Sequence, residues 1–435
     1  MATRFGMGFL RPLETLRMNE GPKNACTRPR SSDGAGMAAL YIDRLTLTAF
    51  RNHSKTFVET GGRSVVLAGP NGAGKTNILE AVSFLSPGRG LRRATMTEVG
   101  QDTKVGQGWG PESNDEAGSS VAPSHWAVSA VLVHSGGTLR IGTGPDPEAR
   151  PGQGRRLVRI DGQSASQTAL GEHLAMVWLT PAMDRLFMEG AANRRRFLDR
   201  LVYGHDSGHA GALAGYEHAM RERSRLLRAG RFDRAWLDGL EETMARKGIA
   251  VAAGRRLLVD RLQLADQQAR FGEGSVDTVF PRVDVALSGT IEAGLSDLPA
   301  LEVEDQFRRR LRDARGVDAV AGGAADGIHR SDLLVSHRAK GVGAAQCSTG
   351  EQKALLLGLV LANARLLATA RGAAPILLMD EVAAHLDSRR RAALFAEIKA
   401  LGAQAWFTGT DAALFDAMRP EAMVLTVDDG TISAA

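Results

Sequence analysis

The chain has 435 residues, of which 43% are hydrophobic and 24% are charged, a composition typical of a folded protein with about two or three domains. Its two cysteines, Cys26 and Cys347, exclude a disulfide framework, and neither has a second Cys or a His at zinc-ligand spacing. No continuous apolar run approaches the length of a membrane-spanning helix, about 18 residues. We therefore predict a cytoplasmic protein that does not cross a membrane.

Much of the net charge of +5 lies near the N-terminus. Residues 1–36 contain six Lys or Arg and three Asp or Glu, which gives 6 − 3 = +3, and they show no apolar periodicity. They also lack the continuous apolar stretch of a secretory signal. We predict that this segment is a disordered tail, or upstream sequence from a start codon assigned too early. A chain that begins at Met37 is then expected to keep its ligands.

A glycine-rich loop is the first motif that carries chemistry. Residues 42–48 alternate as a half-buried strand, and residues 64–68 form a short apolar strand. Directly after it, residues 69–76 read Gly-Pro-Asn-Gly-Ala-Gly-Lys-Thr, which fills every fixed position of G-x-x-x-x-G-K-[ST]. A helical pattern follows, and its N-terminus favours negative charge. A plain Gly-rich turn is the alternative, but this context indicates a polyphosphate-binding loop.

Each residue of this loop has a predicted role toward ATP. The phosphates are expected to be bound by Gly69, Pro70, Asn71, Gly72, Ala73 and Gly74, through the backbone N–H groups of all of them except Pro70, which has none. Lys75 is expected to reach the β- and γ-phosphates, and the hydroxyl of Thr76 is expected to bind Mg²⁺. Arg51 or Asn52, after the first strand, either touches the nucleotide or forms a surface turn.

The middle of the chain changes character at about residue 182. Before it, residues 101–123 are typical of a loop, and residues 125–133, 139–142 and 157–160 are typical of antiparallel strands, with a hairpin at Asp161-Gly162. After it comes long helical periodicity. We predict a helical arm over 181–310, inserted between two parts of a head at 37–180 and 311–435. Residues 311–326 are the predicted return linker.

A second nucleotide-site element begins with Cys347-Ser348-Thr349-Gly350-Glu351-Gln352-Lys353 and opens a long helix rich in Leu and Ala. Ser348 and Glu351 have the spacing of a capping box, which is the structural interpretation. The functional interpretation is an ABC-type signature, in which Ser348 and Gly350 face the γ-phosphate of ATP bound on another head. The two are compatible, since both use the free N–H groups of the helix.

Two acidic residues complete the predicted site. The apolar strand 376–379 runs directly into Asp380 and Glu381. Asp380 is placed to hold Mg²⁺, and Glu381 is placed to polarise the attacking water as a general base. An acidic pair that merely closes a strand is the alternative. The Leu386-Asp387 turn and the Arg-rich helix after it make that alternative weaker.

The order of these motifs resembles that of ABC ATPases and, within them, the RecF family of bacterial recombination-repair proteins. The segments that carry the resemblance are residues 45–52, 69–93, 179–184, 193–199 (Asn-Arg-Arg-Arg-Phe-Leu-Asp), 327–333 (Gly-Ile-His-Arg-Ser-Asp-Leu), 347–353, 376–381 and 407–411. It implies an α/β fold: an ABC-type (SMC/Rad50-like) P-loop ATPase head with an inserted, mainly helical arm.

The resemblance also implies a function. The chain is expected to bind ATP and Mg²⁺, to form a symmetric homodimer on ATP, and to bind DNA at gaps or single-strand/double-strand junctions. It would help load the recombinase together with RecR and RecO, as a weak DNA-dependent ATPase in which Lys75 and Glu381 are catalytic. Two departures from ordinary ABC ATPases are shared with RecF proteins: Thr408 stands where a switch His is expected, and Thr180-Pro181 replaces the Q-loop glutamine. They predict slow turnover.

Two arginine clusters are candidates for DNA phosphate contacts. Arg89, Arg92 and Arg93 follow the P-loop helix, and Arg194, Arg195 and Arg196 open a helix of the arm. A solvated basic face is the alternative. Aromatic residues make up 5% of the chain and do not interleave with the arginines, so duplex or junction binding is favoured over base stacking.

Three rival functions remain open. A transport ATPase subunit is disfavoured by the inserted arm and the absent switch His. An SMC-like structural or nuclease-partner head is disfavoured because the insertion is too short for a long coiled coil. A degenerate nucleotide binder without turnover is disfavoured by Lys75, Asp380 and Glu381.

Overall fold

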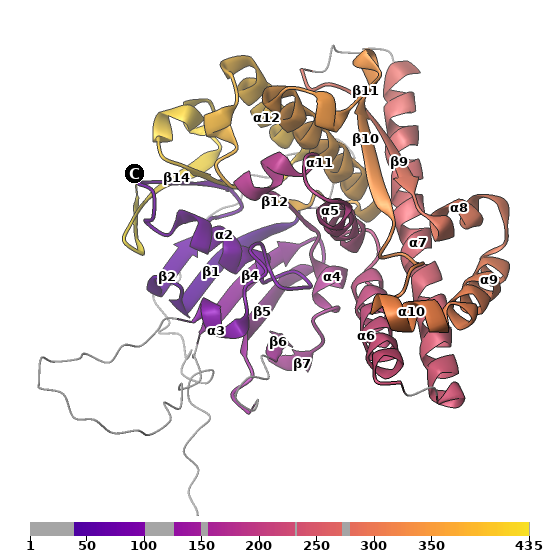
Figure 1. Cartoon of the computed structure of the whole chain (residues 1–435). Coiled ribbons are helices and arrows are strands. Elements are labelled where there is room, and N and C mark those ends of the chain that lie inside the picture. The colour runs from indigo at the N-terminus through magenta and orange to yellow at the C-terminus, as the bar shows by residue number, and fades with distance from the viewer. Residues whose placement is uncertain (1–38, 101–125, 149–154, 231–232, 272–278, 435) are drawn as a thin grey trace, which may run out of the picture. The chain divides into compact units, whose positions relative to one another are not determined.

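The computed structural model describes residues 39–100, 126–148, 155–230, 233–271 and 279–434 (Figure 1), and side chains for these except 266–271. The predictions for residues 1–36 and for the loop over 101–123 fall outside the described residues. Three sheets and a group of helices make up the part of the chain that follows Leu40.

The central sheet carries the nucleotide motifs. Its strand order is β15-β14-β3-β13-β12-β8, and all neighbours are parallel except β14 and β15. The strands are β3 (Ser64–Ala68), β8 (Met176–Leu179), β12 (Ile376–Met379), β13 (Ala405–Gly409), β14 (Ala422–Asp428) and β15 (Thr431–Ala434). The middle strands are buried on both faces, which explains why β12 and β13 read as nearly continuous apolar runs.

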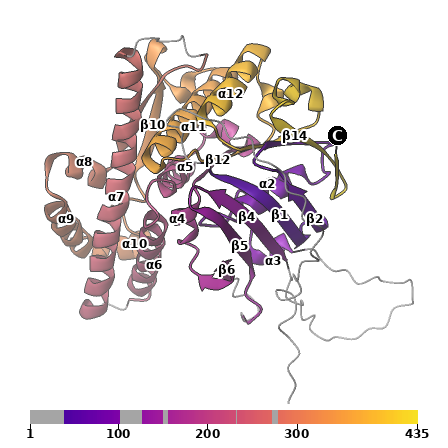
Figure 2. The same ribbon diagram turned by 180° about the vertical axis from the view of Figure 1, so that it is seen from behind.

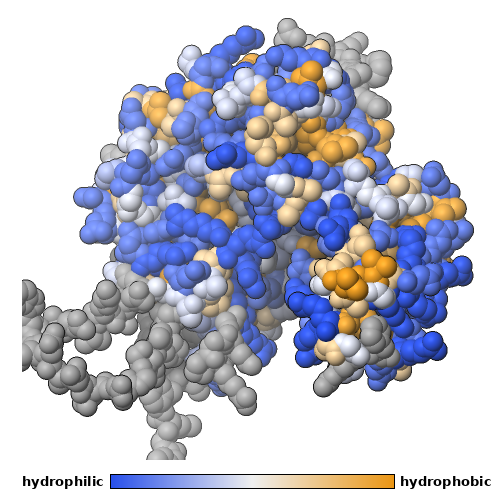
Figure 3. All heavy atoms as spheres, in the orientation of Figure 1, coloured by the Kyte–Doolittle hydropathy of each residue, from blue (hydrophilic) through white to orange (hydrophobic). Residues whose placement is uncertain are grey.

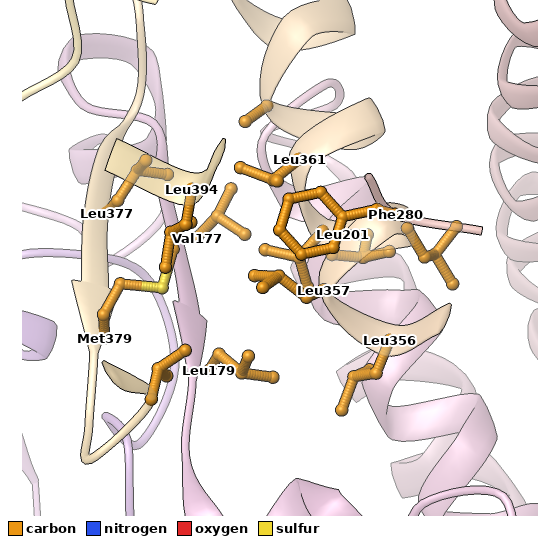
Figure 4. Close-up of a cluster of buried hydrophobic side chains, with 14 of the residues drawn as sticks. Val177, Leu179, Leu201, Phe280, Leu356, Leu357, Leu361, Leu377, Met379 and Leu394 are labelled. Carbon is orange, nitrogen blue, oxygen red and sulfur yellow. The ribbon is translucent and has the colours of Figure 1, made fainter. Parts of the chain in front are cut away.

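Alternation along these strands feeds two separate cores. On β12, Leu377 and Met379 belong to one buried cluster, while Ile376 and Leu378 belong to the other. Figure 4 shows the first cluster, in which Leu377 and Met379 face Leu357 and Leu361 of α11 (Thr349–Arg371). The helix α12 (Ser388–Leu401) adds Leu394 to the same core.

The second core lies between the central sheet and an antiparallel sheet of order β2-β1-β4-β5-β6-β7. Its strands are β1 (Tyr41–Phe50), β2 (His53–Glu59), β4 (Ala127–His134), β5 (Gly137–Pro145), β6 (Arg156–Ile160) and β7 (Gln163–Ala165). The predicted hairpin is confirmed: Asp161 and Gly162 join β6 to β7 with positive φ angles of 47° and 82°. Helices α2 (Lys75–Ser83), α3 (Met96–Val99) and α4 (Leu170–His173) accompany this sheet (Figure 2).

The arm is mainly helical. It contains α5 (Ala191–Tyr203), α6 (His209–Arg228), α7 (Arg234–Phe271), α8 (Thr290–Asp297), α9 (Ala300–Asp313) and α10 (Arg315–Ala321). A small antiparallel sheet of β9 (Val283–Ser288), β10 (Asp332–His337) and β11 (Val342–Gly343) lies against α5, α7 and α11 (Figure 1).

Two features of the arm differ from expectation. The return-linker prediction is wrong for residues 311–321, because α9 and α10 cover them and bury Leu311 and Asp318. Only Gly322 and the residues after it remain as a connection, with Gly322 ending α10 at a φ of 76°. The expected boundary at residue 310 falls inside α9, so we propose to move it to Gly322.

The helix α11 is long and apolar enough to pass a membrane-span test by length and composition, alone among the described helices. Its window is 61% buried inside the protein, as expected of a core helix. Most of the large apolar side chains that are exposed lie on the arm, where Val317 and Val320 of α10 are 66% and 91% exposed. Apolar atoms gather on that part of the surface in Figure 3.

Candidate nucleotide site

The glycine-rich loop connects β3 to α2 and depends on glycine at two positions. Gly69 has a φ of 154°, and a Cβ there would lie 2.1 Å from the carbonyl oxygen of Val427. Gly74 has a φ of 106°, and a Cβ there would lie 2.6 Å from the side chain of Asn52. Gly72 also has a positive φ, 84°, but a Cβ there would meet only open space. Neighbouring residues therefore pack closely against one side of the loop at Gly69 and Gly74, and the other side is open at Gly72.

Residues from the first hairpin back this loop. The Asn52 side chain donates to the Ala73 carbonyl at 3.0 Å and accepts from Asn77 at 2.7 Å. The ring of His53 lies 3.1 Å from the carbonyl oxygen of Gly74 through Nε2. Arg51 instead pairs with Glu80 of α2, donating to both carboxylate oxygens at 2.9 and 2.8 Å. Asn52 therefore shapes the loop, and Arg51 fastens the hairpin to the P-loop helix.

Lys75 is nearly buried, with 4% of its surface exposed. Its Nζ donates to the carbonyls of Gly69 and Pro70, both at 2.7 Å. Burial lowers the pKa of Lys75, while the carboxylates of Glu381 and Asp380 act to raise it. The ammonium group thus lies at the loop and close to both predicted acids.

Two hydroxyls from distant parts of the sequence meet at Asp380. The Thr76 hydroxyl donates to Asp380 Oδ1 at 2.8 Å, and the Thr408 hydroxyl donates to the same oxygen at 2.8 Å. Parallel pairing explains the meeting, since Met379 of β12 is in register with Phe407 of β13. The backbone N–H of Glu381, at a φ of 53°, donates to the Thr408 hydroxyl at 2.8 Å.

This set of donors fits a hard divalent cation. A hydroxyl and a carboxylate within hydrogen-bond distance are oxygen ligands of the kind that Mg²⁺ prefers. The adjoining cavity is lined by Thr180, Pro181, Asp184, Lys353, Asp380, Glu381 and His385, among others. Asp380 and Glu381 therefore line one cavity, whereas Thr76 and the rest of the P-loop are not among its lining residues.

The signature segment lies at the exposed N-terminus of α11. The capping box is confirmed, since the Ser348 hydroxyl accepts from the Glu351 N–H and the Glu351 carboxylate accepts from the Ser348 N–H. Lys340 also pairs with Glu351, and together these bonds lower the pKa of Glu351 to about 2. Lys353 bridges to Asp184 at 2.6 Å. In the described part of the chain, no hydrogen bond or ion pair joins Ser348 or Gly350 to residues 69–76.

The arginines predicted to contact DNA separate into those bonded within the protein and those exposed to solvent. Arg194 donates to both oxygens of Asp332 at 2.8 and 2.7 Å, and Arg195 donates to the Ser331 carbonyl at 2.6 Å, so both hold α5 against β10. By contrast, Arg93 and Arg196 are exposed. The pKa of Arg93 is lowered by burial and by the nearby charges of Arg196 and Arg89, which places the two clusters next to each other.

Arg92 is intermediate between these kinds. It is exposed and donates to Asn77 at 2.7 Å, and its guanidinium lies 3.5 Å from a Glu80 oxygen. Sequence reasoning missed Thr408 as a partner of both acids and His53 as a support of the loop. The polar Thr-Gly-Thr after a buried strand is the only local signal that could have pointed to Thr408.

Comparison with known proteins decides the family, although no family model matches the chain. The DNA replication and repair protein RecF of Allorhizobium ampelinum is 48% identical over 396 residues, which cover 90% of this chain and 98% of that protein. RecF of Mesorhizobium japonicum is 47% identical over 397 residues, covering 91% and 98%. RecF of Brucella suis is 47% identical over 392 residues, covering 90% and 96%.

The chain belongs to the RecF family. Solved structures of RecF, the recombination mediator of the RecFOR pathway, agree in fold. The RecF-ATP structure has a TM-score of 0.74 at 20% identity and covers 93% of this chain. The RecF-ATPrS structure has a TM-score of 0.73 at 20% identity and covers 92%. Both are covered over their whole length. The predicted α/β fold, a head with an inserted, mainly helical arm, is therefore confirmed.

Proposed function

We propose that this RecF-family chain is an ATP-dependent DNA-binding protein of recombinational repair, working in the cytoplasm. One observation carries the proposal: Thr76 of the P-loop and Asp380 of the Asp-Glu strand, 304 residues apart, share a hydrogen bond of 2.8 Å beside Lys75. Such a convergence of an intact phosphate loop with a buried acid is what an ATPase site needs. The RecF structures named with ATP support the same ligand.

ATP would lie along the loop from Gly69 to Thr76, with Mg²⁺ held by Thr76 and Asp380. When bound, the cation would neutralise charge on the phosphates and polarise them. Lys75 would move its ammonium from the loop carbonyls to the β- and γ-phosphates. Glu381, half-buried beside the cavity, would accept a proton from the attacking water. Without a switch His, turnover would be slow.

The proposed homodimer is supported by the exposed N-terminus of α11, which carries the signature segment. Ser348, Thr349 and Gly350 are exposed, and a Cβ on Gly350 would meet nothing within 4 Å. Because this helix N-terminus has no bond to the loop of its own chain in the described residues, its anion would come from a second copy. Two chains related by a two-fold axis would each complete the other's site. ATP would therefore control dimerisation.

DNA would be held through phosphates by Arg89, Arg92, Arg93 and Arg196. Their exposure supports this part of the proposal. We withdraw Arg194 and Arg195 from the candidates, because Asp332 and the Ser331 carbonyl already satisfy them. Gapped duplexes and single-strand/double-strand junctions are the proposed substrates, with RecR and RecO as partners by family. The protein would then help load the recombinase.

The deciding experiment measures affinity for a gapped duplex at fixed salt, with ATP and with ADP. The wild-type protein is expected to bind tightly only with ATP, and Lys75→Ala is expected to lose that difference. Arg308→Ala is a matched control, since Arg308 is an exposed arm residue paired with Asp305 at 2.8 Å. Equal, weak binding in every condition would contradict a nucleotide-gated DNA clamp. A chain that begins at Met37 is expected to behave as the full chain does.

A further inference from the structure

Thr408 has an unusual position for a neutral side chain at a nucleotide site. It is fully buried near the end of β13 and pairs in register with Leu67 of β3. Its hydroxyl makes two hydrogen bonds of 2.8 Å, donating to the carboxylate of Asp380 and accepting from the backbone N–H of Glu381. A single hydroxyl therefore joins both acids of the site.

We propose that Thr408 is a positioning residue for ATP hydrolysis, which fixes the Mg²⁺-binding acid and the general base relative to each other. The inference rests on the proposed ATPase function. It assigns a role to the position where ordinary ABC ATPases have a His. In this role Thr408 acts through its hydrogen bonds to Asp380 and Glu381 and does not contact the phosphates.

The hydroxyl is needed because both of its hydrogen-bonding capacities are used. A threonine hydroxyl has one donor proton and can accept as well, whereas valine, of nearly the same shape, has neither capacity. The Glu381 N–H has no other hydrogen bond in the described residues. Its φ of 53° lies in the left-handed region, which is strained for a non-glycine residue. The bond to Thr408 holds Glu381 in this conformation.

The second argument concerns Asp380. Both hydroxyl donors, from Thr76 and Thr408, use the same carboxylate oxygen, Oδ1. Thr76 is also the proposed Mg²⁺ ligand, so its hydroxyl has two tasks. Thr408 has no contact with the cavity and only one task at Asp380. It is therefore the donor that can orient the carboxylate whichever nucleotide is bound.

The experiment compares Thr408→Val with Thr408→Ser. Removal of a hydrogen-bond partner of a metal ligand typically lowers metal affinity or activity about 10–100-fold. We expect Thr408→Val to lower kcat by that factor and to raise the Mg²⁺ concentration for half-maximal rate, while a fluorescent ATP analogue still binds. Thr408→Ser, which keeps the hydroxyl, is expected to restore most of the rate and the Mg²⁺ dependence.

Thr143→Val is the matched control. Thr143 is also a buried strand threonine, and its hydroxyl donates to the Leu157 carbonyl at 2.8 Å in the other sheet. It is expected to leave hydrolysis unchanged. If Thr408→Val does not fold, Thr408→Cys, whose S–H group is a weak donor, is expected to hydrolyse ATP more slowly than the wild type and Thr408→Ser.

The outcomes separate the two proposals. A wild-type protein that binds and hydrolyses ATP, together with a Thr408→Val protein of unchanged kcat and Mg²⁺ dependence, overturns the role of Thr408 alone. Equal impairment of the serine and valine variants also overturns it, since shape and not the hydroxyl would then matter. A wild-type protein that neither binds nor hydrolyses ATP overturns the proposed function and this inference with it.

Discussion

Two buried carboxylates, Asp199 in the arm and Asp380 in the head, have nearly the same exposure and different partners. Asp199 is 3% exposed and accepts from Arg255 through both oxygens at 2.8 and 2.9 Å, with His209 at 2.9 Å. Asp380 is 6% exposed and accepts from two hydroxyls. One charge is thus neutralised by a guanidinium, while the other has only neutral donors.

The difference separates a structural acid from a functional one. Burial alone would raise the pKa of Asp199, but His209 and Arg255 outweigh it and the pKa is lowered. In the described residues no guanidinium pairs with Asp380, although Lys75 lies close enough for their charges to interact. The Asp380 carboxylate, bonded to two neutral hydroxyls and to no guanidinium, is therefore available to the proposed cation.

Other buried charged groups of the arm are also held in ion pairs with arginine, as Asp199 is. Arg223 is fully buried and pairs with Glu241 at 2.9 Å and Asp318 at 2.7 Å, which ties α6 to α7 and α10. Arg255 adds Glu292 of α8 at 3.4 Å and the Ile328 carbonyl at 2.8 Å. These networks hold the helices of the arm together.

The largest predicted effect is on stability, at Arg255. Arg255→Met removes the guanidinium and leaves the buried Asp199 without its ion-pair partner, so we expect the free energy of unfolding to fall by about 3–5 kcal/mol. Urea denaturation of the full chain measures it. Arg308→Met, which breaks an exposed pair, is expected to change stability by less than about 1 kcal/mol. Equal, small losses in both variants would remove the distinction drawn here.

The same substitution at both acids tests the comparison directly. Asp199→Asn places an amide against Arg255 and is expected to lower the free energy of unfolding by about 3 kcal/mol. Asp380→Asn breaks no ion pair and is expected to lower it by less than about 1 kcal/mol, since amide and hydroxyls can still bond. However, Asp380→Asn is expected to abolish the stabilisation of the protein by ATP with Mg²⁺. The reverse ranking of the two stabilities would contradict the comparison.

The ion pair of Asp199 can also be tested through the pH dependence of stability. Asp199 has a folded pKa below its unfolded value of about 3.9, so its stabilisation is complete above that pH and is lost as the pH falls through the folded pKa. Asp199→Asn removes this contribution. Its stability is therefore expected to fall less steeply than that of the wild type below about pH 4. If the free energy of unfolding falls equally steeply with pH in the wild type and in Asp199→Asn, Asp199 is not charged in the native state.

Much of the nucleotide site could be predicted because its signals are local. Lys75 and Thr76 belong to one continuous motif, and Asp380 follows an unmistakable apolar strand. Thr408 could not be predicted, because its role depends on β13 lying between β3 and β12 in the sheet. Sequence reasoning could note only that a His was absent there.

The arm was less predictable because its stabilising ion pairs also depend on contacts between residues that are distant in sequence. Arginine is normally exposed, so a sequence pattern gives no reason to bury Arg223 or Arg255. Arg194 is in the same run as Arg196 and has the same chemistry, but its partner Asp332 lies 138 residues away. Long-range pairing of charges, and not local composition, decided which arginines are structural.

The smallest predicted effect extends the comparison to these cations. Arg196 bonds to the neutral side chain of Asn193, and Arg93 has no ion pair in the described residues, so both keep their charge for an anion. Each phosphate contact contributes about one unit to the slope of log K against log salt. Arg93→Ala and Arg196→Ala are each expected to lower that slope by about one for a gapped duplex with ATP. Arg308→Ala, whose partner is Asp305, is expected to keep the wild-type slope. If all three variants keep the wild-type slope, Arg93 and Arg196 do not contact DNA phosphates. The distinction between ion-paired and unpaired charged groups, drawn from Asp199 and Asp380, would then apply to the nucleotide site alone.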